Sequence, residues 1–339
     1  MTQEGENGLL FAQRLNGDGS GTAIGWEEVK AWKTGDKPVW IHLDRTDPNV
    51  ETWLRDESGL TSETVNALLS EESRPRVFKG KRGTVAIFRG VNLNPDAKRS
   101  DMVDLRLWSE GERLITLRKT RLQTVRNVLA KLAEGGDGPA TISALFQDLS
   151  FTLCQRMSQT IEGIKDRVDQ VQDEFDLSAP DKTRVDLMDV RNNAISLRRY
   201  IAPQRIAMGE LIVDPPQWAD NNWHAKMREV AETLAYYVEE LDSARDQALV
   251  YKDDVASQLA ESTNRTLYAL AVISAIFLPL AFLTGLLGIN IGGMPGVESS
   301  SAFWVFCALL LGSGVLKSRF SKSLSGYDPT TLATAGRIR

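Results

Sequence analysis

The feature that most constrains this chain is a long stretch without charge. Residues 267–297 contain no Asp, Glu, Lys or Arg, and Glu298 is the one charged residue before Lys317. As a helix, the first part of this stretch, residues 267–287, would span about 31 Å, the thickness of a bilayer core. A second apolar run, residues 302–316, would span about 22 Å. We therefore predict two transmembrane helices; the alternative is a helical hairpin buried in a soluble core.

The charges that flank these runs predict their orientation. The loop 288–301 has no Lys or Arg, whereas residues 317–339 carry five basic residues against one acid. By the positive-inside rule both termini are expected in the cytoplasm and the short loop outside. The first residues have acids and glycines where a secretory leader has bases and apolar residues. The body of the chain is therefore expected not to be exported.

The overall composition excludes several other classes of protein. The 339 residues carry a net charge of −5, without the basic excess typical of nucleic-acid binding. Two His and two Cys cannot build a His/Cys metal cage within one chain. No Ser/His/Asp or Cys/His set suggests catalysis, so we expect no enzyme and no tightly bound cofactor. The average hides an acidic segment, residues 205–261, with twelve acids against five bases, which in a symmetric bundle would form rings that concentrate cations.

Residues 1–139 are predicted to form a cytoplasmic α/β domain. Runs rich in β-branched and aromatic residues predict strands over 9–15, 38–44, 76–80, 83–93, 102–110 and 112–118. Helical spacing predicts helices over 62–72 and 120–134, followed by a Gly-rich linker. The segment Asn16–Gly21 imitates a calcium loop, but a strand precedes it, so we expect a hairpin loop. His42 falls in a strand and is expected to be a packed core residue.

The next two segments are predicted to be helical. Residues 140–216 should form two antiparallel helices, a helical hairpin, and residues 217–266 a stalk helix that continues into the first span without Pro or Gly at the junction. The stalk carries a seven-residue repeat, composed of Val230, Leu234, Tyr237, Leu241, Ala244, Ala248, Tyr251, Val255, Gln258 and Ser262. Two interpretations remain open: this stripe bundles with copies of the chain, which we favour, or it packs on its own domain.

A motif stands at the end of the first span. Gly288, Ile289 and Asn290 are followed by Ile-Gly-Gly-Met-Pro-Gly. A Gly-X-Asn between two C-terminal spans resembles the CorA superfamily of divalent-cation transporters, and the longer string resembles its ZntB-type zinc transporter branch. Upstream, Thr263-Asn264-Arg265 and the Phe-Leu-Pro at 277–279 also match that pattern. Gly296 stands where the magnesium branch typically has Glu.

The resemblance implies a homopentamer, with five stalks forming a funnel and five first spans lining a pore. The residues it places on the pore face are Leu267, Leu270, Ser274, Leu278, Ala281 and Gly285, with Gly288, Ile289 and Asn290 as the external ion filter. A ring of Asn290 amides can hydrogen-bond the water shell of a cation without stripping it, and Leu270 and Leu278 rings can gate by dewetting. Ala281 departs from the family, which often has Thr there.

The function we predict is transport of a divalent cation, most simply zinc uptake with optional proton coupling, across a bacterial inner membrane. Zinc rests on the resemblance alone, because the pore face has no His or Cys. The one candidate zinc ligand near the funnel is His224. Two alternatives stay open: a CorA-like Mg²⁺, Co²⁺ or Ni²⁺ channel, and a membrane-anchored coiled-coil scaffold or sensor without flux. We have no role for the tail after residue 322.

Overall fold

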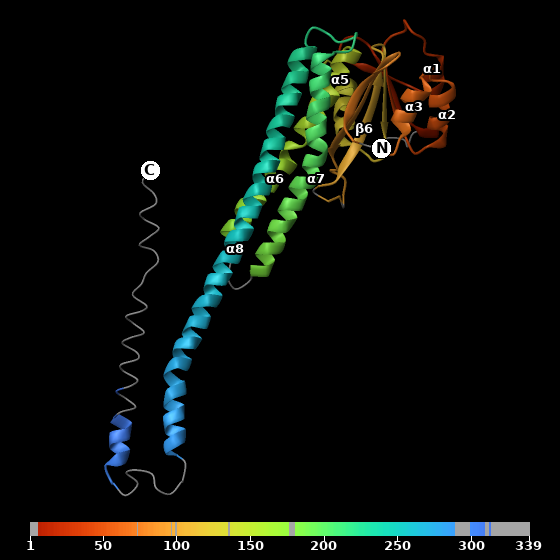
Figure 1. The fold of residues 1–339 in the computed structure, drawn as a ribbon. Coiled ribbons are helices and arrows are strands. Elements are labelled where there is room, and N and C mark those ends of the chain that lie inside the picture. The colour runs from red at the N-terminus through yellow and green to blue at the C-terminus, as the bar shows by residue number, and fades with distance from the viewer. Residues whose placement is uncertain are drawn as a thin grey trace. The chain divides into compact units, whose positions relative to one another are not determined.

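A computed structural model describes residues 6–72, 74–95, 97–98, 100–134, 136–175, 180–288, 299–308 and 312 (Figure 1). The chain divides into two compact units, residues 1–255 and 256–339. The finer division into seven segments stays a prediction. The Gly288-Ile289-Asn290 motif lies outside the described residues from Ile289 onward, and so do residues 309–311 and 313–316 of the second apolar run and the tail.

The first unit is built on a seven-stranded mixed sheet of order β2-β1-β3-β7-β6-β5-β4. Strands β3 and β7 are parallel, and the other neighbours are antiparallel. The six predicted strands are confirmed, with ends that differ by at most two residues; β2 was not predicted. Their bounds are β1 Leu9–Leu15, β2 Gly21–Ile24, β3 Val39–Asp44, β4 Arg76–Gly80, β5 Gly83–Val91, β6 Met102–Ser109 and β7 Arg113–Arg118.

Both faces of the sheet are buried, which explains why its strands read as nearly continuous apolar runs. Side chains alternate along β5, so Val85 and Ile87 enter one core while Ala86 and Phe88 enter the other. The first core is covered by three short helices on one side of the sheet (Figure 1). They are α1 Trp26–Ala31, α2 Pro48–Asp56 and α3 Ser62–Leu69.

Helix α3 ends three residues earlier than the sequence predicts, and two arginines explain where. Buried Arg106 donates to the carbonyls of Ala67 and Leu68 at 3.2 and 3.0 Å. Arg45 donates to the carbonyls of Leu69 and Ser70 at 3.1 and 2.8 Å. These donors satisfy the last carbonyls of the helix, which have no partner inside it.

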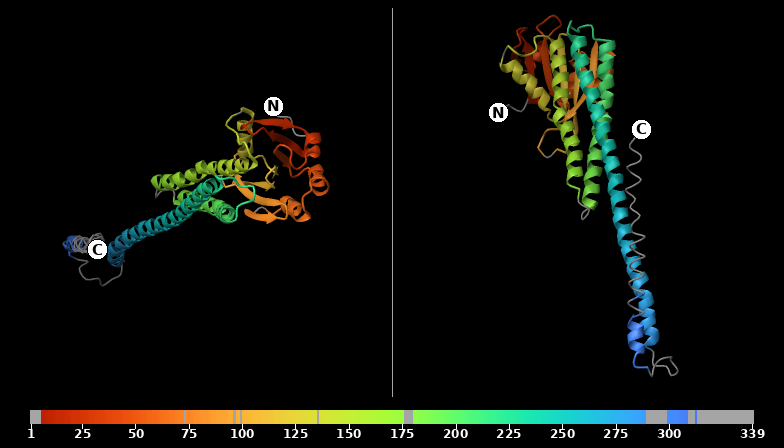
Figure 2. Two further views of the ribbon diagram at one scale, coloured as in Figure 1. Left: turned by 90° about the horizontal axis from the view of Figure 1, so that it is seen from above. Right: turned by 90° about the vertical axis from the view of Figure 1, so that its left-hand side faces the viewer.

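The other face is covered by the helices of the predicted hairpin and by the start of the stalk (Figure 2). The hairpin is confirmed: one arm is the consecutive pair α5 and α6, and the other is α7. The helices on this face are α4 Gln123–Glu134, α5 Ile142–Gln155, α6 Ser158–Asp173, α7 Pro180–Val213 and α8 Trp223–Leu287. Pro203 lies inside α7, where it removes one backbone hydrogen bond.

The predicted continuity of stalk and first span is confirmed, because α8 is one helix of 65 residues, about 98 Å long. It starts at Trp223, six residues after the predicted start of the stalk. Pro215 and Pro216 follow the end of α7 and prevent that helix from continuing. The turn before α8 is closed by a hydrogen bond from the Trp223 N–H to the Asp220 carbonyl at 3.1 Å.

Candidate ion pathway

Helix α8 is anchored at its N-terminal end by an aromatic cluster. Trp223 is fully buried, and its indole N–H donates to the Leu211 carbonyl at 2.9 Å. The Phe146 ring centroid lies 5.6 Å from that of Trp218 and 5.4 Å from that of Trp223. These contacts fix where the stalk leaves the domain.

The stripe that we expected to bundle copies is largely used inside the chain. Val230, Leu234, Leu241 and Ala248 are at most 2% exposed and belong to the core under the sheet. The favoured interpretation is therefore wrong for residues 230–248, which pack on their own domain. The seven-residue repeat cannot distinguish packing on another copy from packing on the same domain, since any long helical partner requires apolar residues at this spacing.

A row of four acids lies on the opposite face of α8. Their seven-residue spacing keeps them in line along the helix, and all are exposed: Glu232, Glu239, Asp246 and Asp253. We call this row the acidic ladder. Asp246 pairs with its neighbour Arg245 at 2.9 Å, while no basic side chain of the described residues lies within 4.0 Å of the other three. The ladder therefore presents largely uncompensated negative charge.

The C-terminal part of α8 is apolar and uncovered. Its richest window has a mean hydropathy of 2.3, and none of that window is buried. Leu278 is 74% exposed and Phe282 is 68% exposed. Within the described residues, α8 is the one helix long and apolar enough to cross a membrane.

The six described residues of the predicted pore face share one side of this helix. At about 100° per residue, positions 267, 270, 274, 278, 281 and 285 fall within about 40° of a common line, and all six are exposed. The opposite side holds Val272, Ile276 and Leu280, which are half-buried. The structure thus leaves the predicted face exposed.

The filter motif is described only at its first residue. The Gly288 N–H donates to the carbonyls of Thr284 at 2.9 Å and Gly285 at 3.2 Å, which closes the last turn of the helix. Ile289 and Asn290 lie outside the described residues. The second span is described over 302–308, where the chain is helical, and at residue 312.

The described part of the chain contains no group of three His, Cys, Asp or Glu side chains that could hold a metal ion. His224 is exposed and stands apart from any such group, so its role as a zinc ligand stays a prediction.

Other residues weighed on the sequence have structural roles. His42 is 1% exposed; its Nδ1 lies 2.8 Å from the Thr116 hydroxyl, and burial lowers its pKa to about 3. Burial raises the pKa of the Cys154 thiol to about 12, so this thiol is unreactive. The segment at Asn16 is a hairpin loop between β1 and β2, in which Asp18 accepts hydrogen bonds from Ser20.

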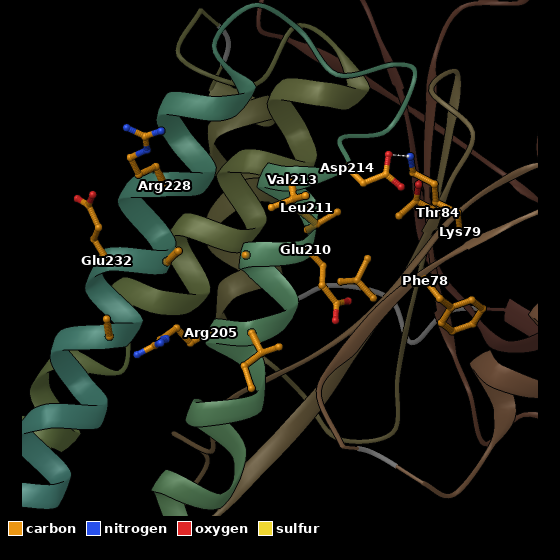
Figure 3. Close-up of a pocket in the computed structure, with 15 residues that line it drawn as sticks. Phe78, Lys79, Thr84, Arg205, Glu210, Leu211, Val213, Asp214, Arg228 and Glu232 are labelled. Carbon is orange, nitrogen blue, oxygen red and sulfur yellow. Dashed lines mark hydrogen bonds and ion pairs between the residues drawn. The ribbon is translucent and has the colours of Figure 1, made fainter.

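A groove that the sequence did not indicate lies between β4, α7 and α8 (Figure 3). Its volume is about 740 Å³, and Lys79 of β4 pairs with Asp214 beyond the end of α7 at one rim. None of the predicted site residues lines it. Its apolar wall comes from side chains such as Ile206 and Val213, which are 61% and 86% exposed.

An α/β domain joined by one continuous helix to an exposed charge-free segment of bilayer length defines a class: membrane proteins with a large domain outside the bilayer. Residues 35–317 match the family model described as "CorA-like Mg2+ transporter protein". The chain therefore belongs to the CorA family.

Two kinds of CorA-family relative stand out by name. The divalent cation transporter CmaX of Pseudomonas aeruginosa is 36% identical over 312 residues, covering 91% of this chain and 93% of that protein. The zinc transport protein ZntB of Yersinia pseudotuberculosis is 31% identical over 303 residues, covering 89% and 91%.

Solved structures agree with this fold. Full-length CmaX superposes with a TM-score of 0.82 at 33% identity, covering 95% of this chain and 99% of that one. The CorA magnesium transporter from Methanocaldococcus jannaschii gives 0.75 at 14% identity, covering 91% and 96%, which shows a shared fold alone.

Proposed function

We propose that several copies of this chain, five by the family resemblance, form a pore that transports divalent cations across a bacterial inner membrane. The observation that carries the proposal is the exposed, charge-free segment of α8 in a chain that belongs to the CorA family. Apolar side chains left uncovered on this scale need either lipid or other copies around them. The loop 288–301 would face outward and both termini the cytoplasm, as the charge pattern predicts.

The residues assign a simple sequence of events to the cation. Asn290 amides would hydrogen-bond its water shell at the outer mouth. Leu278 and Leu270 would form apolar constrictions, separated by the hydroxyls of Ser274. The acidic segment, residues 205–261, would then attract the cation on the cytoplasmic side, since rings of carboxylates raise the local cation concentration.

Zinc uptake is the finer form of the proposal. It is supported by the Gly-Ile-Asn-Ile-Gly-Gly-Met-Pro-Gly string and by the relatives named as zinc transport proteins. The pore face has no titratable side chain, so any coupled proton would bind elsewhere. A broader specificity that includes Mg²⁺, Co²⁺ or Ni²⁺ is favoured by the relative named as a divalent cation transporter.

Flux into proteoliposomes tests the proposal. The full chain is reconstituted with a zinc-sensitive dye inside the vesicles, and Mg²⁺, Co²⁺ or Ni²⁺ is added outside as a competitor. We expect zinc flux that falls by about tenfold or more in Asn290→Ala. Asn222→Ala, at an exposed position before α8, is the matched control and should keep wild-type flux. Unchanged flux in Asn290→Ala would remove the filter role, and absence of flux for every ion would remove transport.

A further inference from the structure

An assembly of copies needs a contact surface, and the stalk stripe is not free to supply it. Val230, Leu234 and Leu241 are buried in the chain's own core. The outward face of α7, by contrast, is largely exposed. Positions 185, 188, 192, 195, 199, 202, 206, 209 and 213 follow alternating steps of three and four residues, the spacing of a coiled-coil seam.

This seam is apolar at most of its positions, and its five large apolar side chains are exposed. The exposed fractions are 58% for Val185, 46% for Met188, 40% for Ile195, 61% for Ile206 and 86% for Val213. The other positions hold Asn192, Arg199, Ala202 and Gly209. Single exposed apolar residues need no explanation, but a row at seam spacing is the pattern of a helix that awaits another helix.

A row of arginines at seven-residue spacing runs beside the seam, each one position before a seam residue: Arg184, Arg191, Arg198 and Arg205. We call it the arginine ladder. Arg198 reaches α8 within the chain, where its Nε lies 2.7 Å from Asp242 Oδ1. Over the described ranges, no acidic side chain lies within 4.0 Å of Arg184, Arg191 or Arg205. In coiled coils, charges beside the seam select the partner and its orientation.

The acidic ladder of α8 matches this row in spacing and length. Each ladder has four charges seven residues apart, and each extends over about 32 Å. Within one chain the two ladders do not pair, because Glu232, Glu239 and Asp253 lie on the face of α8 opposite its buried stripe. Helices α7 and α8 run in opposite directions along their shared contact (Figure 2). Copies related by a rotation keep this antiparallel arrangement, so the arginines of one copy can align with the acids of its neighbour.

We propose that the seam and arginine ladder of α7 bind the acidic ladder of α8 from a second copy of this chain. The groove of Figure 3 is the end of the same surface, since Val213 of α7 and Glu232 of α8 both line it. Ile206 and Gly209 of the seam line it as well. The inference rests on the proposed assembly of several copies and names its contact. Burial of the seam beside the three unpaired charges of each ladder would favour assembly and fix its register.

The test reverses one ladder at a time in the full chain. Variant R184E/R191E/R205E makes both ladders negative, and variant E232R/E239R/D253R makes both positive. All six side chains are exposed, so both variants should keep wild-type helical content by circular dichroism. In detergent we expect light scattering to show each variant alone at the single-chain mass of 37.6 kDa. Mixed together, the two variants should form a complex that contains both.

The control K33E/K37E/K81E changes the same number of exposed charges on the α/β domain and should assemble as the wild type does. A ladder variant that keeps the wild-type mass, or a folded pair that does not associate on mixing, would overturn the inference. Transport is judged separately: wild-type flux in a ladder variant of wild-type mass removes the interface and leaves the proposed function intact. If the wild type assembles but shows no flux, the proposed function is removed and the interface remains.

Discussion

Helix α8 carries the same residue types in two opposite conditions. Leu234 is 0% exposed near its start, and Leu278 is 74% exposed near its end. In the first unit, apolar side chains fill two cores against a sheet, whereas from residue 267 they stand uncovered. The difference shows that the hydrophobic effect in water can fold the first unit, while the apolar side chains of the second unit need a different surrounding. In the first unit burial removes apolar surface from water; in the second, lipid or other copies must do so.

The largest expected difference between the two units comes from a matched pair of substitutions. Phe146→Ala removes a fully buried ring between Phe88, Trp218 and Trp223 and should lower the free energy of unfolding of the first unit by about 3–5 kcal/mol. Phe282→Ala removes a ring that is 68% exposed and should leave that free energy unchanged. Urea unfolding of the chain in detergent measures both. Equal losses would contradict the division into two environments.

A smaller loss is expected from the arginine that ends α3. Arg106 is fully buried, and its Nε lies 2.7 Å from Asp104. Arg106→Met leaves that carboxylate and several carbonyls without a donor, which should cost about 3 kcal/mol. The control Arg55→Met breaks an exposed pair with Glu51 and should cost less than about 1 kcal/mol. Denaturant midpoints of the two variants decide this, and a similar small cost for both would refute the role of Arg106.

The smallest of the three effects appears with pH. Burial lowers the pKa of His42 from 6.5 to about 3, so between these values the unfolded chain binds more protons than the folded one. The stability that neutral His42 contributes is complete above pH 6.5 and falls as the pH drops toward 3. At pH 5 the loss should be about 2 kcal/mol. His42→Gln should flatten this part of the stability profile, while exposed His224→Gln should not; parallel profiles for all three proteins would disprove the assignment.

Much of the fold was predictable because local patterns and packing agree. The four central strands β3, β5, β6 and β7 are buried on both faces, and α8 is continuous although Pro279 lies inside it. Helix α2 was missed, although Asp47 accepts a hydrogen bond from the Asn49 N–H as its cap and Pro48 opens it, both sequence signals. Helix α1 has only 6 residues, about one and a half turns, so its formation depends on packing against the neighbouring sheet.

The candidate site was predictable only in part. A charge-free segment of bilayer length is visible in the sequence, and so is the spacing of the face that we predict to line the pore. What the stalk stripe contacts was not, because the same repeat serves a partner in the same chain or in another one. The sequence also left the α7 seam unnoticed, since its importance depends on which face of α7 the domain covers.

The most direct test of the central claim is which face of α8 meets the ion. In a Cys307→Ser background, Cys154 can stay because burial makes its thiol unreactive. Ser274→Cys and Ile276→Cys are each reconstituted and treated with a cationic thiol reagent while zinc flux is followed. A pore lined by the predicted face should be blocked by about tenfold or more at Cys-substituted position 274 and unaffected at position 276. Block at 276 with none at 274 would contradict the account.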